Sequence, residues 1–115
     1  MNRSFEELAE HYETPLYVYE GDKIIQNFNL FKNAFKVKNL KVHYAVKALS
    51  NIAVLNLFKS LGAGLDCVSV EEIKLGIAAG FSPEDIIFTP NGVSFEEYKE
   101  AIAVSYTHLT LPTKA

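Results

Sequence analysis

The sequence predicts an α/β fold with a parallel sheet. After Asn39, three short apolar segments alternate with three helical patterns, and the strands begin about every twenty residues. Alternation of this kind indicates right-handed strand–helix–strand units whose strands run parallel. No glycine-rich G-x-G-x-x-G turn opens any of the helices, which argues against a dinucleotide-binding sheet. The pattern by itself fits both an open sheet and a closed barrel.

The first helix is predicted to begin after Ser4. Ser4 and Glu7 have the spacing of a capping box, in which each side chain accepts a hydrogen bond from the backbone of the other residue. The helix is expected to run to about His11. Residues 14–15 are Thr-Pro and end it, because the residue before a proline disfavours helical dihedrals.

A strand and a second helix are predicted next. Residues 16–19 read Leu-Tyr-Val-Tyr, a composition of apolar, aromatic and β-branched side chains that is typical of a strand. Between residues 23 and 35, apolar side chains recur at steps of three and four, which predicts an amphipathic helix. Its buried stripe is expected to comprise Ile24, Phe28, Phe31 and Phe35.

The chain from residue 40 to about residue 102 is predicted to form three βα units. The strands are expected at residues 40–46, 65–68 and 86–89, and the helices at residues 51–61, 69–80 and 94–102. Gly62 and Gly80 are placed to end the first two of these helices. Ser-x-x-Glu sequences that begin at Ser69 and Ser94 repeat the capping-box spacing at the start of the other two.

Three polar side chains lie at or just after the carboxyl ends of the predicted strands. They are Lys47, Asp66 and Asn91, each about one βα unit from the next. Reactive groups of parallel barrels gather at this edge, so we expect the three to lie near one another. A lysine that loses its hydration there has a lowered amine pKa and can attack a carbonyl carbon to form a Schiff base. The alternative is a surface lysine that closes an edge strand.

Five segments of the chain form a recognisable series: TPLYVY at residues 14–19, YAVKA at 44–48, GLDCVSVEE at 64–72, AGF at 79–81 and IIFTPNG at 86–92. In this order they resemble the barrel-type decarboxylases that use pyridoxal phosphate, and among them the diaminopimelate decarboxylases. The resemblance covers about residues 5–103. It implies a partial (β/α)₈ TIM barrel of the alanine-racemase-like kind, reduced to an N-terminal segment and three βα units, since a whole barrel needs about 250 residues.

The resemblance also implies a cofactor site. Lys47 would carry pyridoxal 5′-phosphate as a Schiff base, with Ala45, Asp66 and Glu72 beside it, and Asp66 would pair with the lysine ammonium when that link opens. A turn or helix-capping role remains the alternative for Asp66 and, through the Ser69 spacing, for Glu72. His43 shares the parity of Lys47 along the strand, and a hydrogen-bonded core histidine is the preferred interpretation. No metal site is predicted.

The activity implied for a full-length parent is the decarboxylation of meso-2,6-diaminopimelate to L-lysine and CO₂, a step of lysine biosynthesis. A sister decarboxylase for ornithine, arginine or carboxynorspermidine, or a non-catalytic α/β module, are the alternatives. Relatives add a later glycine-rich phosphate loop, an acidic residue against the pyridine nitrogen, and residues from a C-terminal domain and a partner subunit. A homodimeric parent and an inactive fragment are therefore expected.

Composition excludes several other classes. The net charge is −3 without a clustered basic face, so no nucleic-acid surface is expected. No apolar run approaches the roughly 20 residues of a membrane span, and the N-terminus lacks the apolar segment of a signal peptide. Cys67 is the single cysteine and is expected to be a buried, inert thiol. These features favour a cytoplasmic protein.

The chain is predicted to divide near its end. Residues 1–103 form the N-terminal part of the cofactor-binding barrel domain. Residues 104–115 do not continue the family pattern and resemble translated sequencing-adapter sequence, so they are predicted to be a read-through artefact. A genuine divergent tail is the alternative. His108, within this tail, has no partner at the spacing of a metal site.

Overall fold

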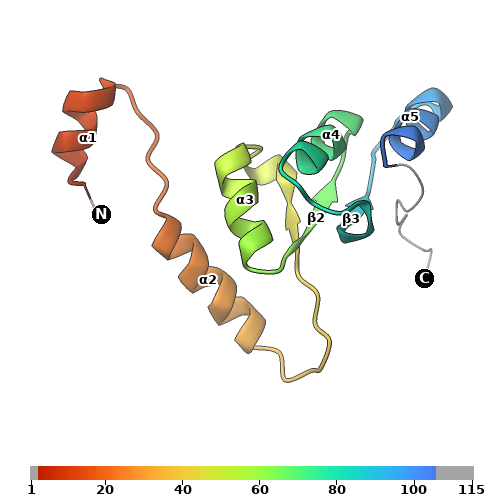
Figure 1. Ribbon diagram of the computed structural model, residues 1–115, viewed down its shortest axis with the longest axis horizontal. Helices are drawn as coiled ribbons and strands as arrows, with labels where there is room; N and C mark the ends of the chain where they lie inside the picture. Colours follow the sequence, from red (N-terminus) through yellow and green to blue (C-terminus); the bar gives the residue numbers. More distant parts are fainter. Residues whose placement is uncertain (1–2, 106–115) are drawn as a thin grey trace.

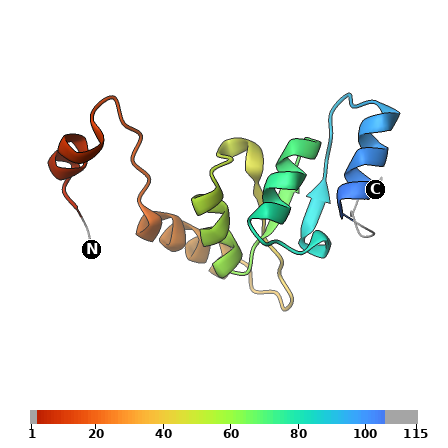
Figure 2. The same ribbon diagram turned by 45° about the horizontal axis from the view of Figure 1, so that its top comes forward.

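Three parallel strands and the helices that follow them form the centre of the computed structural model, which describes residues 3–105. The strands are β1 (His43–Ala45), β2 (Gly64–Cys67) and β3 (Ile86–Phe88), and the helices are α3 (Ile52–Ser60), α4 (Val70–Ala78) and α5 (Phe95–Ser105). The sheet order is β1-β2-β3 with parallel pairing throughout. The three helices lie side by side in chain order (Figures 1 and 2). The predicted α/β class and the three βα units are confirmed, while the described sheet stays open.

The two faces of the sheet differ in their side chains. Leu65 and Cys67 on β2, with Ile86 and Phe88 on β3, are fully buried in one core with the helices. Because successive side chains of a strand point to opposite faces, Asp66 between them lies on the other face. The register pairs Asp66 with Ala45 on β1 and with Ile87 on β3, so these side chains share that face. The candidate residues of β1 and β2 therefore lie on the face that the helices leave open.

Helix α4 packs closely against β2. A Cβ atom added at Gly76 would lie 2.6 Å from the Leu65 Cδ1 atom, so only glycine permits this approach without a shift of Leu65. Ile73 on the same helix is fully buried, as is Leu55 on α3. Burial of these side chains stabilises each by about 1.5–3 kcal/mol relative to exposure. The contact fixes the helix layer on one side of the strands.

Local signals in the sequence set the helix ends. Asn51 caps α3, with its Oδ1 accepting hydrogen bonds from the backbone N–H groups of Ala53 and Val54 at 2.9 and 3.3 Å. Gly62 and Gly80 follow α3 and α4 with φ of 80° and 88°, the left-handed conformation that glycine adopts without strain. The predicted stops are confirmed. The reciprocal capping box of α5 is also present between Ser94 and Glu97, and that of α1 (Phe5–Tyr12) likewise.

The predicted strand at residues 16–19 is wrong. These residues are extended but belong to no sheet, and all four are exposed, with Tyr17 89% exposed. A strand forms only when a neighbouring chain accepts and donates its backbone hydrogen bonds. No such neighbour lies beside this segment among residues 3–105, and the Thr14–Pro15 peptide before it is cis.

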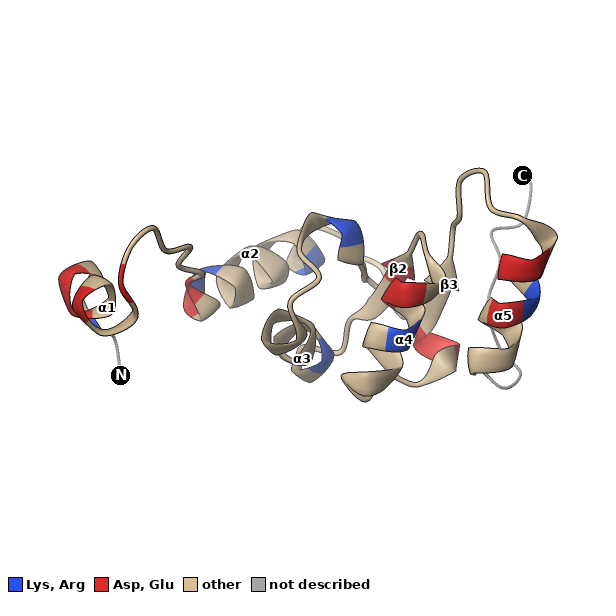
Figure 3. Ribbon diagram, turned by 90° about the horizontal axis from the view of Figure 1, so that it is seen from above, with Lys and Arg blue, Asp and Glu red and all other residues tan. Residues whose placement is uncertain are grey.

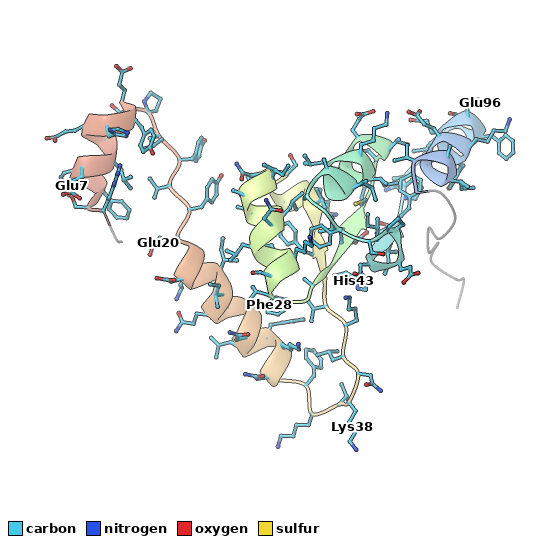
Figure 4. The ribbon with its side chains drawn as sticks, viewed as in Figure 1. Glu7, Glu20, Phe28, Lys38, His43 and Glu96 are labelled. Atoms are coloured by element: carbon cyan, nitrogen blue, oxygen red, sulfur yellow. The ribbon has the colours of Figure 1, made fainter. Side chains whose placement is uncertain are left out.

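Helix α2 (Gly21–Asn33) confirms the helical period but not the full buried stripe. Only Phe28 is buried, and its ring meets Phe58 of α3 edge-on at 6.1 Å, at the junction visible in Figure 4. Phe31 is 54% exposed and Phe35 lies beyond the helix end. Helices α1 and α2 extend away from the sheet (Figure 1), and the radius of gyration is 16.6 Å, against about 13 Å for a compact domain of this length.

Helix α5 continues to Ser105, two residues past the predicted domain boundary. Residues 106–115, on which most of the predicted artefactual tail falls, lie outside the described residues. Acidic and basic side chains occur together on α2, α4 and α5 (Figure 3). Within the described part, none of the helices has the length and apolar character that crossing a membrane requires.

Candidate active site

Lys47 lies on a turn rather than at the end of a strand. The predicted strand at residues 40–46 is shorter, because β1 ends at Ala45 and Val46–Ala48 form one 3₁₀ turn. The side chain of Val46 is fully buried in the core at the start of this turn. The parity of the strand therefore does not reach Lys47, and its side chain is exposed, not enclosed in a pocket.

Tyr44 holds this turn in place. Its hydroxyl donates a hydrogen bond to the Leu49 carbonyl at 3.0 Å, and its ring stacks on Phe58 with centroids 4.0 Å apart. The Leu49 N–H closes the turn by donating to the Val46 carbonyl at 3.1 Å. Burial raises the pKa of the Tyr44 hydroxyl, which keeps it a donor. Sequence reasoning missed this role, since it noted Tyr44 only as part of a motif.

Replacement of Tyr44 by phenylalanine tests this clamp. Tyr44→Phe keeps the stacked ring but removes the donor to Leu49, so we expect a loss of about 1 kcal/mol in stability and a lower thermal midpoint of the full-length protein. Tyr98→Phe is the matched control, because the Tyr98 ring packs on Phe88 while its hydroxyl makes no hydrogen bond within the described residues. Equal midpoints for the two variants would contradict the clamp.

Asp66 is held from the neighbouring strand. Its Oδ1 accepts a short hydrogen bond from the Thr89 hydroxyl, and the Thr89 N–H donates to the Cys67 carbonyl at 2.8 Å. Sequence reasoning missed Thr89, because its place beside Asp66 depends on the register of β2 with β3, which only the structure gives. Thr89 lies two residues after Ile87, which pairs with Asp66, so both side chains fall on the open face.

Glu72 caps helix α4. Its Oε2 accepts a hydrogen bond from the Val68 N–H at 2.7 Å, while the Ser69 Oγ accepts one from the Glu72 N–H at 3.2 Å. The Ser69 half of the predicted capping box is confirmed, but the reciprocal half is wrong, because the Glu72 carboxylate binds the Val68 N–H instead of the Ser69 N–H. The structure gives Glu72 this helix-capping contact and no described contact with Lys47.

His43 lies at the opposite, amino end of β1, against Gly64. A Cβ atom added at Gly64 would lie 2.6 Å from the imidazole Cδ2, so the glycine leaves the space that the ring occupies. Burial lowers the pKa of His43, and the positive charge of Lys41 acts in the same direction. Lys41 forms an ion pair with Asp85 at 3.0 Å. His43 is half-buried and its ring makes no hydrogen bond within residues 3–105, so the expectation of a hydrogen-bonded core histidine is wrong. It lies at the end of β1 opposite the carboxyl edge that precedes Lys47.

The structure also places Cys67 and Asn91, which the sequence analysis singled out. Cys67 is fully buried, and burial, with smaller effects of Glu72 and Asp66, raises the pKa of its thiol to about 12, so the thiol is inert. Asn91 is exposed in the loop after β3. Among residues 3–105, no group of His, Cys, Asp and Glu side chains has metal-binding geometry.

A groove of about 330 Å³ lies between β1 and helices α2 and α3. Its lining is mainly aromatic and aliphatic and comes from α2, β1 and α3, with Phe28, Tyr44, Ala45 and Phe58 among the contributors. Of the candidate site residues, Ala45 alone lines it. The groove therefore lies beside the carboxyl edge and does not enclose Lys47.

Two groups near the carboxyl edge of the sheet complement each other chemically. Lys47 offers an exposed primary amine two residues beyond Ala45, and Asp66 offers a carboxylate on the strand paired with Ala45. Within the described residues the two side chains share no hydrogen bond or ion pair, and the Asp66 carboxylate is engaged by Thr89. An amine in this position can condense with an aldehyde, and the carboxylate can balance the charge of the free ammonium.

Comparisons with known proteins agree with this chemistry. Residues 21–114 match the family model described as "Pyridoxal-dependent decarboxylase, pyridoxal binding domain". A diaminopimelate decarboxylase of Helicobacter pylori is 41% identical over 108 residues, which are 94% of this chain and 27% of that protein. The chain thus spans about a quarter of the length of the curated relatives it matches.

Solved structures give the same result. The crystal structure of Helicobacter pylori diaminopimelate decarboxylase with L-lysine is similar with a TM-score of 0.82 and 38% identity, over 96% of this chain and 28% of that one. A lysine/ornithine decarboxylase of Vibrio vulnificus in complex with putrescine has a TM-score of 0.79 and 27% identity, over 86% and 27% of the two chains. Both similarities extend over most of the chain, with its sheet and helices.

Proposed function

Because this chain belongs to the family of pyridoxal-dependent decarboxylases and matches the pyridoxal-binding domain of that family, we propose that it is the N-terminal part of the barrel domain of a diaminopimelate decarboxylase. The full-length protein would convert meso-2,6-diaminopimelate to L-lysine and CO₂. The observation that supports the proposal is the position of Lys47, an exposed amine on the turn that follows β1, whose last residue, Ala45, pairs with Asp66.

The residues present fit pyridoxal phosphate at this edge. The cofactor needs an amine for covalent attachment, and Lys47 is exposed on a turn that the buried Val46 and the Tyr44 hydrogen bond fix. It also needs room for a planar ring. Ala45, Asp66 and Ile87 are partners across the three strands, and Ala45 has the smallest side chain of the three, which leaves space on the open face. The Lys47 amine would thus supply the attachment, and the Asp66 carboxylate a negative charge near it.

The roles of the chain's own residues follow from this fit. When bound, the cofactor supplies an electron sink for the bond electrons that remain as CO₂ leaves. Lys47 would hold it through Nζ and, once displaced by the substrate amine, carry a proton there as an ammonium group. Asp66 would pair with that ammonium and stabilise its charge. Glu72 would act indirectly, through its cap on α4, which fixes the segment after β2.

The rest of the active site is expected from outside this chain. A (β/α)₈ barrel needs about 250 residues, and we expect the phosphate-binding loop, the acid at the pyridine nitrogen and a homodimer partner to come with the full-length protein, in the cytoplasm. Residues 1–115 expressed alone are expected to release no CO₂ from diaminopimelate. Turnover by this segment in a radiometric CO₂ assay would contradict that division of the site.

Substrate choice is the experiment that tests the proposed activity. The full-length protein is assayed for CO₂ release from meso-diaminopimelate, ornithine, arginine and carboxynorspermidine. We expect kcat/KM for diaminopimelate to exceed the others by about 10²-fold or more. The identity of 41% to a diaminopimelate decarboxylase, against 27% to a lysine/ornithine decarboxylase, supports this order. A preference for ornithine or arginine would move the protein to a sister activity.

A further inference from the structure

We propose that Thr89 is a positioning residue that orients the Asp66 carboxylate toward the Lys47 amine. The inference rests on the proposed function, because it assigns Thr89 a task within the same site. It is carried by the hydrogen bond from the Thr89 hydroxyl to Asp66 Oδ1, which joins β2 to the segment after β3 across the open face.

The Thr89 hydroxyl is a fixed donor. The Thr89 N–H donates to the Cys67 carbonyl at 2.8 Å, which ties its backbone to the strand that carries Asp66. Pro90 follows, and a residue before proline is confined to extended conformations. Threonine is β-branched, so its side chain has few rotamers available. The position and direction of the hydroxyl are therefore set by the local chain.

Asp66 depends on this donor for its orientation. Within the described residues its carboxylate has no hydrogen-bond partner other than Thr89, and Oδ1 is the atom engaged. The second oxygen, Oδ2, remains available to a cation on the open face. Without the hydroxyl, the half-buried side chain would rotate among its rotamers, and Oδ2 would no longer hold one direction.

The position of Lys47 makes this orientation consequential. Lys47 leaves β1 on a turn that follows Ala45, the register partner of Asp66. When a substrate amine takes its place, the Lys47 amine is released as an ammonium group, and a carboxylate held in one orientation needs less reorganisation to pair with it. Loss of the Thr89 hydroxyl should therefore slow the release of Lys47 without preventing cofactor attachment.

The test compares Thr89→Val, which replaces the hydroxyl by a methyl group, with Thr89→Ser, which keeps it, in the full-length protein. Two readouts are taken: the fraction of Lys47 labelled by borohydride after incubation with pyridoxal phosphate, and the rate at which methylamine displaces Lys47 in stopped-flow absorbance. We expect equal labelling in all three proteins, displacement about tenfold slower in Thr89→Val, and a rate within about threefold of the parent in Thr89→Ser. Ile87→Val, a change of the apolar neighbour on the same face, is expected to leave both readouts unchanged.

A double variant establishes that Thr89 acts through Asp66. In an Asp66→Asn background, Thr89→Val is expected to add no further slowing, because the carboxylate it orients is gone. Parental displacement in Thr89→Val, failure of Thr89→Ser to restore the rate, or additive effects of the two changes would each overturn the inference while leaving the proposed function intact. A parent protein that is not labelled at Lys47 would overturn the proposed function and the inference together.

Discussion

Replacement of Lys47 by alanine in the full-length protein is expected to abolish covalent cofactor binding and to lower kcat by about 10³-fold or more. The lysine amine is the one group of the described site that can form the covalent link. The substitution should leave the fold intact, since Lys47 is exposed and its turn is held by Val46 and Tyr44. Absorbance of the bound cofactor and CO₂ release measure the two effects.

Lys38→Ala is the matched control for this loss. Lys38 is exposed in the loop before β1, at the end of the molecule away from the carboxyl edge (Figure 4). Its replacement removes the same charge and chain length, and we expect parental absorbance and turnover. If Lys47→Ala also retained its covalent cofactor and parental turnover, the assignment of Lys47 would be wrong.

Replacement of Gly64 by alanine is expected to be the most damaging change to stability. An added Cβ would lie 2.5 Å from the Asp85 carbonyl oxygen and 2.6 Å from the His43 ring, and the carbonyl belongs to backbone that cannot yield alone. Overpacking of this kind typically costs about 1–3 kcal/mol, and more where backbone must move. We expect a thermal midpoint several degrees below that of the parent, or loss of soluble protein.

Gly21→Ala provides the comparison for Gly64→Ala. Its added Cβ would lie 3.8 Å from the Leu57 Cδ2 atom, an ordinary van der Waals contact, at the first residue of α2. Alanine also restricts the unfolded chain, so we expect stability within about 1 kcal/mol of the parent, in the stabilising direction. A midpoint for Gly64→Ala equal to that of Gly21→Ala would contradict the close approach of β2 to its neighbours.

The parts of the fold that local signals determine were predictable from the sequence. Ser4, Asn51 and Ser94 begin helices because their side chains satisfy backbone N–H groups that the helix leaves free. Gly62 and Gly80 end helices because they adopt positive φ without strain. These interactions join residues only a few positions apart, so their pattern can be read along the chain.

The parts that depend on distant partners were not predictable. Residues 16–19 have the composition of a strand but no neighbouring strand in the described part of the chain. Phe31 follows the helical period, yet it is exposed because α2 meets the remaining layer mainly through Phe28. Val46 is β-branched, as strand residues often are, yet β1 ends before it. Val46 is instead the first residue of the turn that carries Lys47.

The sequence could propose the members of the candidate site but not their contacts. Lys47 and Asp66 were proposed from their position near the carboxyl ends of parallel strands, and the structure places Lys47 on the turn after β1 and Asp66 within β2. The hydrogen bond between Asp66 and Thr89 depends on the register of β2 with β3, which the sequence alone does not fix. The role of Tyr44 likewise depends on where the turn closes, at Leu49.

Peptide mapping after borohydride reduction tests the central claim most directly. The full-length protein is incubated with pyridoxal phosphate, reduced, digested and analysed by mass spectrometry. The position of Lys47 on the exposed turn after β1 predicts one phosphopyridoxyl label, on the peptide that contains Lys47. Label scattered over several lysines, or found on a peptide without Lys47, would contradict the claim and favour a non-catalytic module.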